Sequence, residues 1–238
     1  MSRFRPAFWP TVTALPIFIL LIGLGVWQIE RLHWKEGLIE ARAAALAAPT
    51  AALPTDLAAA RGMEFRHVRA TGEFLHQHEF FLGASNDAGV TGYQVVTPLR
   101  LADGAVLLVN RGWIDAGLKD PSKRAAGEIA GPVTVEGLLR LPPAGRPNWF
   151  VPDNRCDIDY WFWIDIPAMA RCGGLDRVLP FYVDAGPAPN PGGWPKGGVT
   201  RTELPNDHLQ YAITWFSLAA GLVVVYLLYH RKGAVAPQ

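Results

Sequence analysis

Two long runs of apolar residues, one near each end of the chain, dominate the pattern of hydrophobic and polar positions. The first, residues 8–29, reads FWPTVTALPIFILLIGLGVWQI and contains no Asp, Glu, Lys or Arg. The second, residues 209–229, is equally free of these charges and lies within NDHLQYAITWFSLAAGLVVVYLLYHRK. At about 1.5 Å per residue, each run is long enough as a helix to cross a bilayer core of about 30 Å. The pattern predicts transmembrane helices over residues 8–29 and 208–230.

A cleaved signal peptide is the alternative for the first run, because the basic residues Arg3 and Arg5 precede it. The apolar stretch is longer than a usual signal core, and GVWQIERLHW is a poor cleavage site, which favours a retained helix. Two spans put both termini on one side of the membrane and residues 30–207 on the other. Basic residues at the outer ends of the spans predict cytoplasmic termini and an exported domain, although Arg31, Lys35 and Arg42 on the other side dilute this bias.

Between the spans, the pattern changes to short segments rich in aromatic and β-branched residues, which are typical of β-strands. The turn ADG at 102–104 predicts a hairpin, and LIEARAAALAA is expected to continue the first helix until Pro54. IDIPAMARCGG predicts a short helix with Asp165 near its start and Gly173 just past its end. The strand candidates are FRHVRATGEF, EFFLGA, GYQVVTPLRL, AVLLVNRGWI, VTVEGLLRL and VLPFYVDA. The expected fold is a membrane-anchored α+β protein, whose exported domain is a mainly antiparallel sheet or partial barrel with short helices.

Composition and sequence motifs argue against several classes of function. Half of the residues are hydrophobic and the formal net charge is +1, so the electrostatic footprint of a nucleic-acid-binding protein is absent. The sequence lacks the nucleophile elbow, the glycine-rich nucleotide motifs, HExxH and CxxC, so the standard motifs of soluble enzymes are missing. His76 and His78 form either a metal pair or a solvated face of a strand. Cys156 and Cys172 either pair in an oxidising compartment or remain thiols.

Chemistry-bearing residues gather at one level of both predicted membrane helices. An aromatic belt at the membrane interface is the simpler interpretation of the rings, but it does not explain an imidazole and a guanidinium at the same depth. A haem would account for both, because neutral imidazole is a usual axial ligand and basic side chains such as Arg31 and Lys35 bind propionates. Steps of three and four residues form two stripes: His208, Tyr211, Ala212, Trp215 and Ala219 on one helix, and Gly23, Trp27, Arg31 and Trp34 on the other.

Several segments occur in an order that resembles the surfeit locus family of cytochrome c oxidase assembly factors: GLGVWQIERLHWK, GYQVVTPL, VLLVNRGW, FVPDN and PGGWPKGGVTRTELPNDHLQYAITWF. The similarity runs from about Gly25 to Phe216. It implies a non-enzymatic factor that transiently binds haem a, receives it from haem a synthase and helps deliver it to subunit I of a haem-copper oxidase. The family's histidine before LQYAxTWF falls on His208, the proposed haem ligand. The family's glycine in VNRGW falls on Gly112 and its tyrosine in GYxVVTP on Tyr93. Both are interpreted as fold positions, Gly112 as a backbone requirement at a strand end and Tyr93 as a packed ring.

The predicted cofactor site combines the stripes with this resemblance. His208 is the expected metal ligand, and the cofactor-binding residues are His208, Trp27, Arg31, Tyr211 and Trp215. The first span begins within about ten residues of the start, which leaves little room for a mitochondrial targeting peptide, so a bacterial inner membrane with a periplasmic domain is expected. Membrane lipid surrounds the two spans. The alternatives are a scaffold that stabilises oxidase subunits without haem and, less favoured, a tethered enzyme, for which no acid and base pair is evident.

Overall fold

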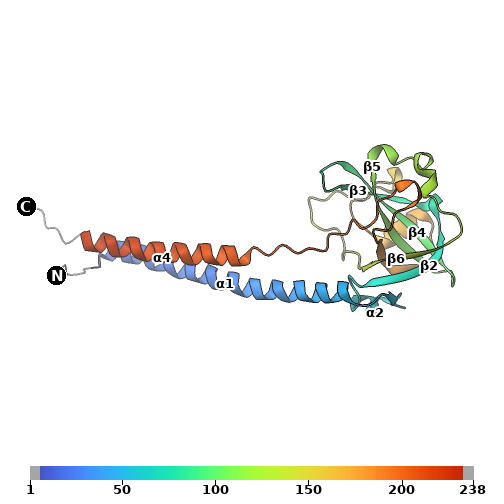
Figure 1. Ribbon diagram of the computed structural model, residues 1–238. Coiled ribbons are helices and arrows are strands. Elements are labelled where there is room, and N and C mark those ends of the chain that lie inside the picture. The colour runs from blue at the N-terminus through green and yellow to red at the C-terminus, as the bar shows by residue number, and fades with distance from the viewer. Residues whose placement is uncertain (1–5, 233–238) are drawn as a thin grey trace, which may run out of the picture. The chain divides into compact units, whose positions relative to one another are not determined.

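The computed structural model describes residues 6–232 and divides into two compact units. The structure has two long helices, α1 (Phe8–Ala47) and α4 (His208–Lys232) (Figure 1). One unit contains α4 and α1 as far as Ala41, and the other is the domain Arg42–Thr202, which includes the last turns of α1. Both helices are long and apolar enough to cross a membrane. The two helical elements expected from the apolar runs at the ends of the chain are therefore confirmed.

Helix α1 continues past its apolar run without a break at Ile29. LIEARAAALA extends it as expected, but it ends at Ala47 rather than at Pro54. Pro49 explains the earlier end, because the residue before a proline is pushed out of the helical conformation. The basic residues Arg3 and Arg5, on which the expected orientation partly rests, lie outside the described residues.

A seven-stranded sheet in the order β1-β2-β6-β7-β5-β4-β3 forms the domain. β2 also pairs with β4, which closes β2, β6, β7, β5 and β4 into a small barrel (Figure 1). Most neighbours are antiparallel, as expected, whereas β5 with β7 and β1 with β2 are parallel. The strands are β1 (Ala51–Ala52), β2 (His67–Phe74), β3 (Phe80–Ser85), β4 (Thr91–Leu101), β5 (Val106–Asp115), β6 (Pro132–Arg140) and β7 (Val178–Ala185). The short helices are α2 (Leu57–Arg61) and α3 (Ile166–Gly173).

Strand β5 is buried along both of its faces, which explains its nearly continuous apolar sequence. Leu107 and Val109 belong to one core cluster, with residues from the other barrel strands, whereas Leu108 packs in a second cluster with Trp161 and Met169. Alternate residues of a strand point to opposite faces, so β5 separates the barrel interior from a layer that includes α3. The hairpin expected between β4 and β5 is present, with these two strands antiparallel.

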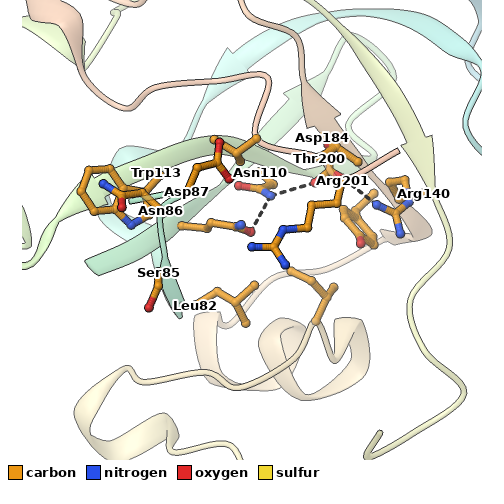
Figure 2. Close-up of a pocket in the computed structure, with 14 residues that line it drawn as sticks. Leu82, Ser85, Asn86, Asp87, Asn110, Trp113, Arg140, Asp184, Thr200 and Arg201 are labelled. Atoms are coloured by element: carbon orange, nitrogen blue, oxygen red, sulfur yellow. Dashed lines mark hydrogen bonds and ion pairs between the residues drawn. The ribbon is translucent and has the colours of Figure 1, made fainter. Parts of the chain in front are cut away.

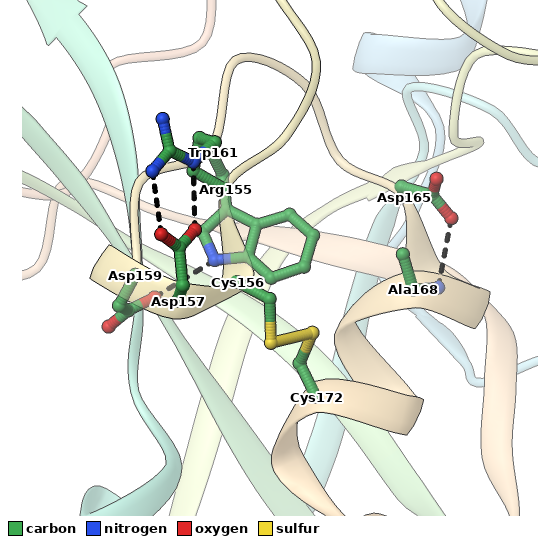
Figure 3. The surroundings of a disulfide bond; sticks show 8 residues. All are labelled: Arg155, Cys156, Asp157, Asp159, Trp161, Asp165, Ala168 and Cys172. Carbon is green, nitrogen blue, oxygen red and sulfur yellow. Dashed lines mark hydrogen bonds and ion pairs between the residues drawn. A yellow bond between two sulfur atoms is a disulfide. The ribbon is translucent and has the colours of Figure 1, made fainter.

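The cysteines pair, which resolves the alternative left open by the sequence. Cys156 lies in the 3₁₀ turn Cys156–Ile158 and forms a disulfide with Cys172 of α3, with their Cα atoms 6.0 Å apart (Figure 3). The side chain of Asp165 caps α3 by accepting a hydrogen bond from the backbone N–H of Ala168, as expected. The helix ends one residue later than expected: Gly173 is its last residue, and Gly174 forms the left-handed cap.

The expected strand face for His76 and His78 is wrong, because both lie in a 3₁₀ turn, His76–His78, between β2 and β3. The chain must turn between Phe74 and Phe80 to pass from β2 to β3. The His76 ring bonds inward to the carbonyl oxygen of Ile129 at 3.1 Å and approaches Glu79 at 3.4 Å. His76 therefore joins a buried polar cluster.

Glu79 is the centre of this cluster and has a depressed pKa. Its carboxylate accepts a hydrogen bond from Thr97 at 3.0 Å, pairs with Arg124 and lies 3.5 Å from Arg111. Burial raises the pKa of Glu79, but hydrogen bonds from His76 and Arg124 and the positive charges of Arg124 and Arg111 outweigh it, so the pKa falls from 4.5 to about 2. One buried carboxylate thus holds two buried guanidinium groups in place.

Acid should weaken the domain through Glu79. Because its folded pKa lies below the ordinary value, its contribution to the free energy of unfolding is present above pH 4.5 and is lost as pH falls toward 2. The shift in pKa corresponds to about 3 kcal/mol of free energy of unfolding.

Glu79→Gln should lower the free energy of unfolding at pH 7 by about that amount and make it depend less on pH. Denaturant unfolding of the full chain measures both effects. Glu136→Gln, which alters an exposed pair with Arg69, should cost less than about 1 kcal/mol. Equal pH dependence in parent and Glu79→Gln would contradict this assignment.

Candidate functional site

The helices α1 and α4 pack side by side and antiparallel, through small residues (Figure 1). Ala212 and Ala219 are buried on α4, and Gly25 is buried on α1. A Cβ added at Gly25 would lie 2.5 Å from the ring of Phe216, whereas one at Gly23 would meet open space. Gly25, rather than the Gly23 of the predicted stripe, is therefore the residue that lets the helices approach closely.

Polar contacts tie the two helices together at both ends of their interface. At one end, the hydroxyls of Thr11 and Tyr226 lie 2.6 Å apart, and the backbone N–H of Ala7 donates to Nε2 of His230 at 3.0 Å. Nδ1 of His230 donates to the carbonyl oxygen of Tyr226 at 2.8 Å. With both ring nitrogens engaged, His230 has no free lone pair for a metal. It also lies about 33 Å along α4 from His208.

At the other end, His208 is the first residue of α4 and contacts Gln28 of α1. Nδ1 of the imidazole lies 2.7 Å from Oε1 of Gln28, and the Gln28 side chain is buried in the interface. With the amide oxygen facing the ring, Nδ1 carries the proton and donates, so the lone pair lies on Nε2. Within residues 6–232, Nε2 of His208 has no hydrogen-bond partner. Histidines that ligate metals usually have this arrangement, with one nitrogen held by an acceptor and the other open.

The aromatic residues of the predicted set divide between two environments. Trp215 is half-buried, two turns along α4 from His208, and its indole N–H is buried without a hydrogen-bond partner in the described chain. Tyr211 and Trp27 are about half exposed, at 55% and 49%. The structure thus leaves Trp215 half-buried on α4 and the other two rings exposed on the helices.

Arg31 lies one turn beyond Gln28 on α1, about 4.5 Å further along the axis. Its guanidinium stacks on Trp34, 4.0 Å from the ring centroid, and forms no ion pair within the part of the chain that the structure describes. Stacking leaves the edge of the guanidinium and its N–H groups open to an anion. Lys35 follows one turn later and is half-buried, also without an ion pair among the described residues.

Gln28 is the residue of this site that the sequence interpretation missed. It is an amide in an otherwise apolar run, three residues before Arg31, and such a polar residue inside a membrane helix usually faces a partner helix. Near Gly25 the helices are in close contact, with the ring of Phe216 against Gly25 and with Ala212 and Ala219 buried. A flat ligand would therefore reach His208 from the side of the helix pair, rather than from between the helices.

Comparison with known proteins gives one consistent result. A family model described as the SURF1 family matches residues 15–220. A SURF1-like protein of Monosiga brevicollis is 40% identical over 231 residues, covering 92% of this chain and 87% of that protein. Surfeit locus protein 1 of Takifugu rubripes is 34% identical, with 85% of this chain and 91% of the relative covered. The human protein of the same name is 34% identical, with coverages of 87% and 72%.

Proposed function

Because the chain belongs to the SURF1 family, we propose that it is an assembly factor for haem-copper (cytochrome c) oxidase that binds haem a and assists its delivery to oxidase subunit I. The resemblance of its motifs to surfeit locus proteins supports the assembly role. The open Nε2 of His208, on a ring oriented by Gln28, supports the haem-binding role. In this proposal haem a is cargo, received from haem a synthase and passed on, and the protein catalyses no reaction.

In this proposal, each side chain near His208 has a separate role in binding haem a. Nε2 of His208 ligates the iron, while Gln28 keeps the ring in one orientation and fixes the proton on Nδ1. Arg31 and Lys35 bind the propionates at the membrane edge. Tyr211 and Trp27 offer exposed aromatic faces to the macrocycle, and the indole N–H of Trp215 offers a hydrogen bond.

The same proposal sets the orientation in the membrane. Both termini lie in the cytoplasm of a bacterium, α1 and α4 cross the inner membrane in contact with lipid, and the domain Arg42–Thr202 lies in the periplasm. Basic residues at the outer ends of both apolar runs support this orientation. The disulfide between Cys156 and Cys172 also supports it, since disulfides persist in oxidising compartments.

A scaffold that stabilises oxidase subunits without binding haem is the alternative, and one surface feature favours it. Trp149 and Phe150 are 77% and 74% exposed, and their ring centroids are 3.7 Å apart. Arg146 holds their loop through hydrogen bonds to the carbonyl oxygens of Trp149 and Val151. An ordered aromatic pair on the surface is typical of a protein-docking site. The two proposals differ in one observable, whether haem a accompanies the purified protein.

Removing the guanidinium of Arg31 should weaken haem retention. We expect Arg31→Ala, co-produced with haem a synthase, to retain about tenfold less haem a per protein, because it loses a charge-assisted hydrogen bond to a propionate. Membrane insertion should be unchanged, because the apolar run is intact. The measurement is the ratio of haem absorbance to protein after purification.

Arg100→Ala is the control, since Arg100 is an exposed arginine on β4 in the domain. It should retain haem like the parent. Equal haem content in Arg31→Ala and Arg100→Ala would show that Arg31 is only a charge that flanks the first span. If the parent itself carries no haem a, the scaffold alternative replaces the haem proposal.

A further inference from the structure

A polar pocket of about 300 Å³ opens within the domain (Figure 2). Its lining comes from the strands β3 to β7, the turn after β3, Ile164 and the segment 199–201, all within the domain Arg42–Thr202. None of the residues predicted for the haem site lines it. Its volume is at the lower limit for small-molecule sites, which suits a ligand the size of one or two amino-acid residues.

A chain of hydrogen bonds fixes the polarity of this pocket. The carboxylate of Asp184 accepts from Nδ2 of Asn110 at 2.7 Å and from Arg140 at 2.9 Å (Figure 2). Oδ1 of Asn110 accepts from the backbone N–H of Gly112 at 3.2 Å, so the Asn110 amide cannot be turned over without losing both contacts. Its remaining N–H donates to Oε1 of Gln94 at 3.0 Å.

These hydrogen bonds leave the side-chain NH₂ group of Gln94 free to donate to a ligand. Because Oε1 of Gln94 is used by Asn110, its NH₂ group is the free end, and it has no partner within residues 6–232. Tyr182 also lines the pocket, and burial, followed by the nearby charge of Asp184, raises the pKa of its hydroxyl. The phenol therefore stays protonated. The pocket thus offers N–H and O–H groups and favours a ligand rich in acceptors.

Arg201 gives the pocket a positive charge. Its side chain extends into the pocket toward Leu82 (Figure 2), and it forms no ion pair or hydrogen bond with any residue that the structure describes. The carboxylate of Asp184 pairs with Arg140 rather than with Arg201. The other acidic group of the lining, Asp87, lies in the exposed turn after β3.

Apolar side chains complete the pocket: Leu82, Trp113 and Ile164. We propose that the domain binds a carboxylate attached to a short apolar group, with the carboxylate held by Arg201 and the amide N–H of Gln94 and the apolar group against these side chains. Two sources have this chemistry, a free carboxylic acid and the C-terminal carboxylate of an extended polypeptide. The site lies outside the unit that contains His208 and does not depend on haem binding.

Ligand-observed NMR on the purified full-length protein tests the proposal with defined probes. 3-Phenylpropionate should bind saturably, and 3-phenylpropionamide should bind at least tenfold more weakly, because it lacks the charge. Acetyl-Gly-Gly-Phe with a free carboxylate is the second probe. Binding of this peptide at least tenfold tighter than 3-phenylpropionate assigns the site to a polypeptide C-terminus, and similar or weaker binding assigns it to a free acid.

Variants connect the binding to the two proposed donors. Gln94→Glu keeps the acceptor for Asn110 but replaces the donating NH₂ with a charged oxygen, so it should weaken 3-phenylpropionate at least tenfold. Arg201→Gln should do the same, and because Arg201 is exposed the fold is retained. Arg69→Gln, an exposed arginine outside the pocket, should bind like the parent. Asp87→Asn should bind as tightly or more tightly.

Several outcomes would overturn the proposal. They are the absence of binding by both acids, equal binding of 3-phenylpropionate and its amide, or parent-like affinity in Arg201→Gln. Weaker binding in Asp87→Asn would also overturn it, because it would mean that the pocket selects a positive group.

Discussion

Gly112→Ala should destabilise the domain by about 5 kcal/mol, which is more than most single substitutions cost. Gly112 lies in β5 at a bulge, where Val95 and Val96 of β4 pair with Gly112 and Asn110 and leave Arg111 without an opposite residue. Its φ of +115° suits only glycine, and a Cβ would lie 1.8 Å from the carbonyl oxygen of Lys196. The expected role of Gly112 as a backbone requirement is therefore confirmed.

The cost has two separate causes. The backbone conformation accounts for about 1–3 kcal/mol. The clash adds the rest, because relief of the contact would break the bridge in which Trp113 and Lys196 exchange backbone hydrogen bonds of 2.8 and 2.9 Å. The bulge also turns Arg111 toward Glu79, so the buried ion cluster would be disturbed as well.

Denaturant unfolding of the full chain, followed by tryptophan fluorescence, measures this effect. Gly89→Ala is the matched control, because Gly89 also has a positive φ, of +78°, but a Cβ there would meet nothing within 4 Å. It should cost about 1–2 kcal/mol. If both variants shift the unfolding midpoint equally, the clash with Lys196 does not matter.

His208→Ala should have the largest effect on haem a. Loss of an outer-shell partner such as Gln28 typically lowers metal affinity by about 10–100-fold, and loss of the ligand itself should lower it further. Expression and insertion should be unaffected, because an interfacial histidine contributes little to the insertion of α4. The haem a bound per protein after co-production with haem a synthase measures the effect, and the amount of assembled oxidase should fall with it.

Two further variants separate ligation from general effects at this level of the membrane. His33→Ala should retain nearly all of the haem, since His33 is exposed on α1 and the family resemblance assigns it no ligand role. Gln28→Leu should fall between His208→Ala and the parent, because the imidazole remains but loses the acceptor for Nδ1. A larger loss in His33→Ala than in His208→Ala would exchange the roles of the two histidines.

The sequence predicted the elements of this fold better than their arrangement. Apolar periodicity and turn residues located both long helices, strands β2 to β7 and α3, because each of these signals is local. Closure of the barrel through β2 and β4, and the parallel pairing of β5 with β7, depend on contacts between distant residues that leave no local pattern. The turn at His76 was missed for the same reason.

The candidate site shows the same division. His208 and Arg31 were predicted because an imidazole and a guanidinium stand out beside apolar runs. The role of Gln28 depends on the register between α1 and α4, which is fixed by Gly25, Phe216 and the buried alanines. The pocket around Arg201 was not predicted, because its donors come from β4, β7 and a loop that are far apart in the sequence.

Chemical rescue of His208→Gly tests the claim that His208 ligates haem a most directly. The variant is co-produced with haem a synthase, purified with and without added imidazole, and compared with the parent by optical spectroscopy. We predict that His208→Gly loses the haem absorbance of the parent, and that imidazole restores both haem content and the spectrum of a histidine-ligated iron. Haem content and a spectrum equal to those of the parent in His208→Gly without imidazole would contradict the assignment.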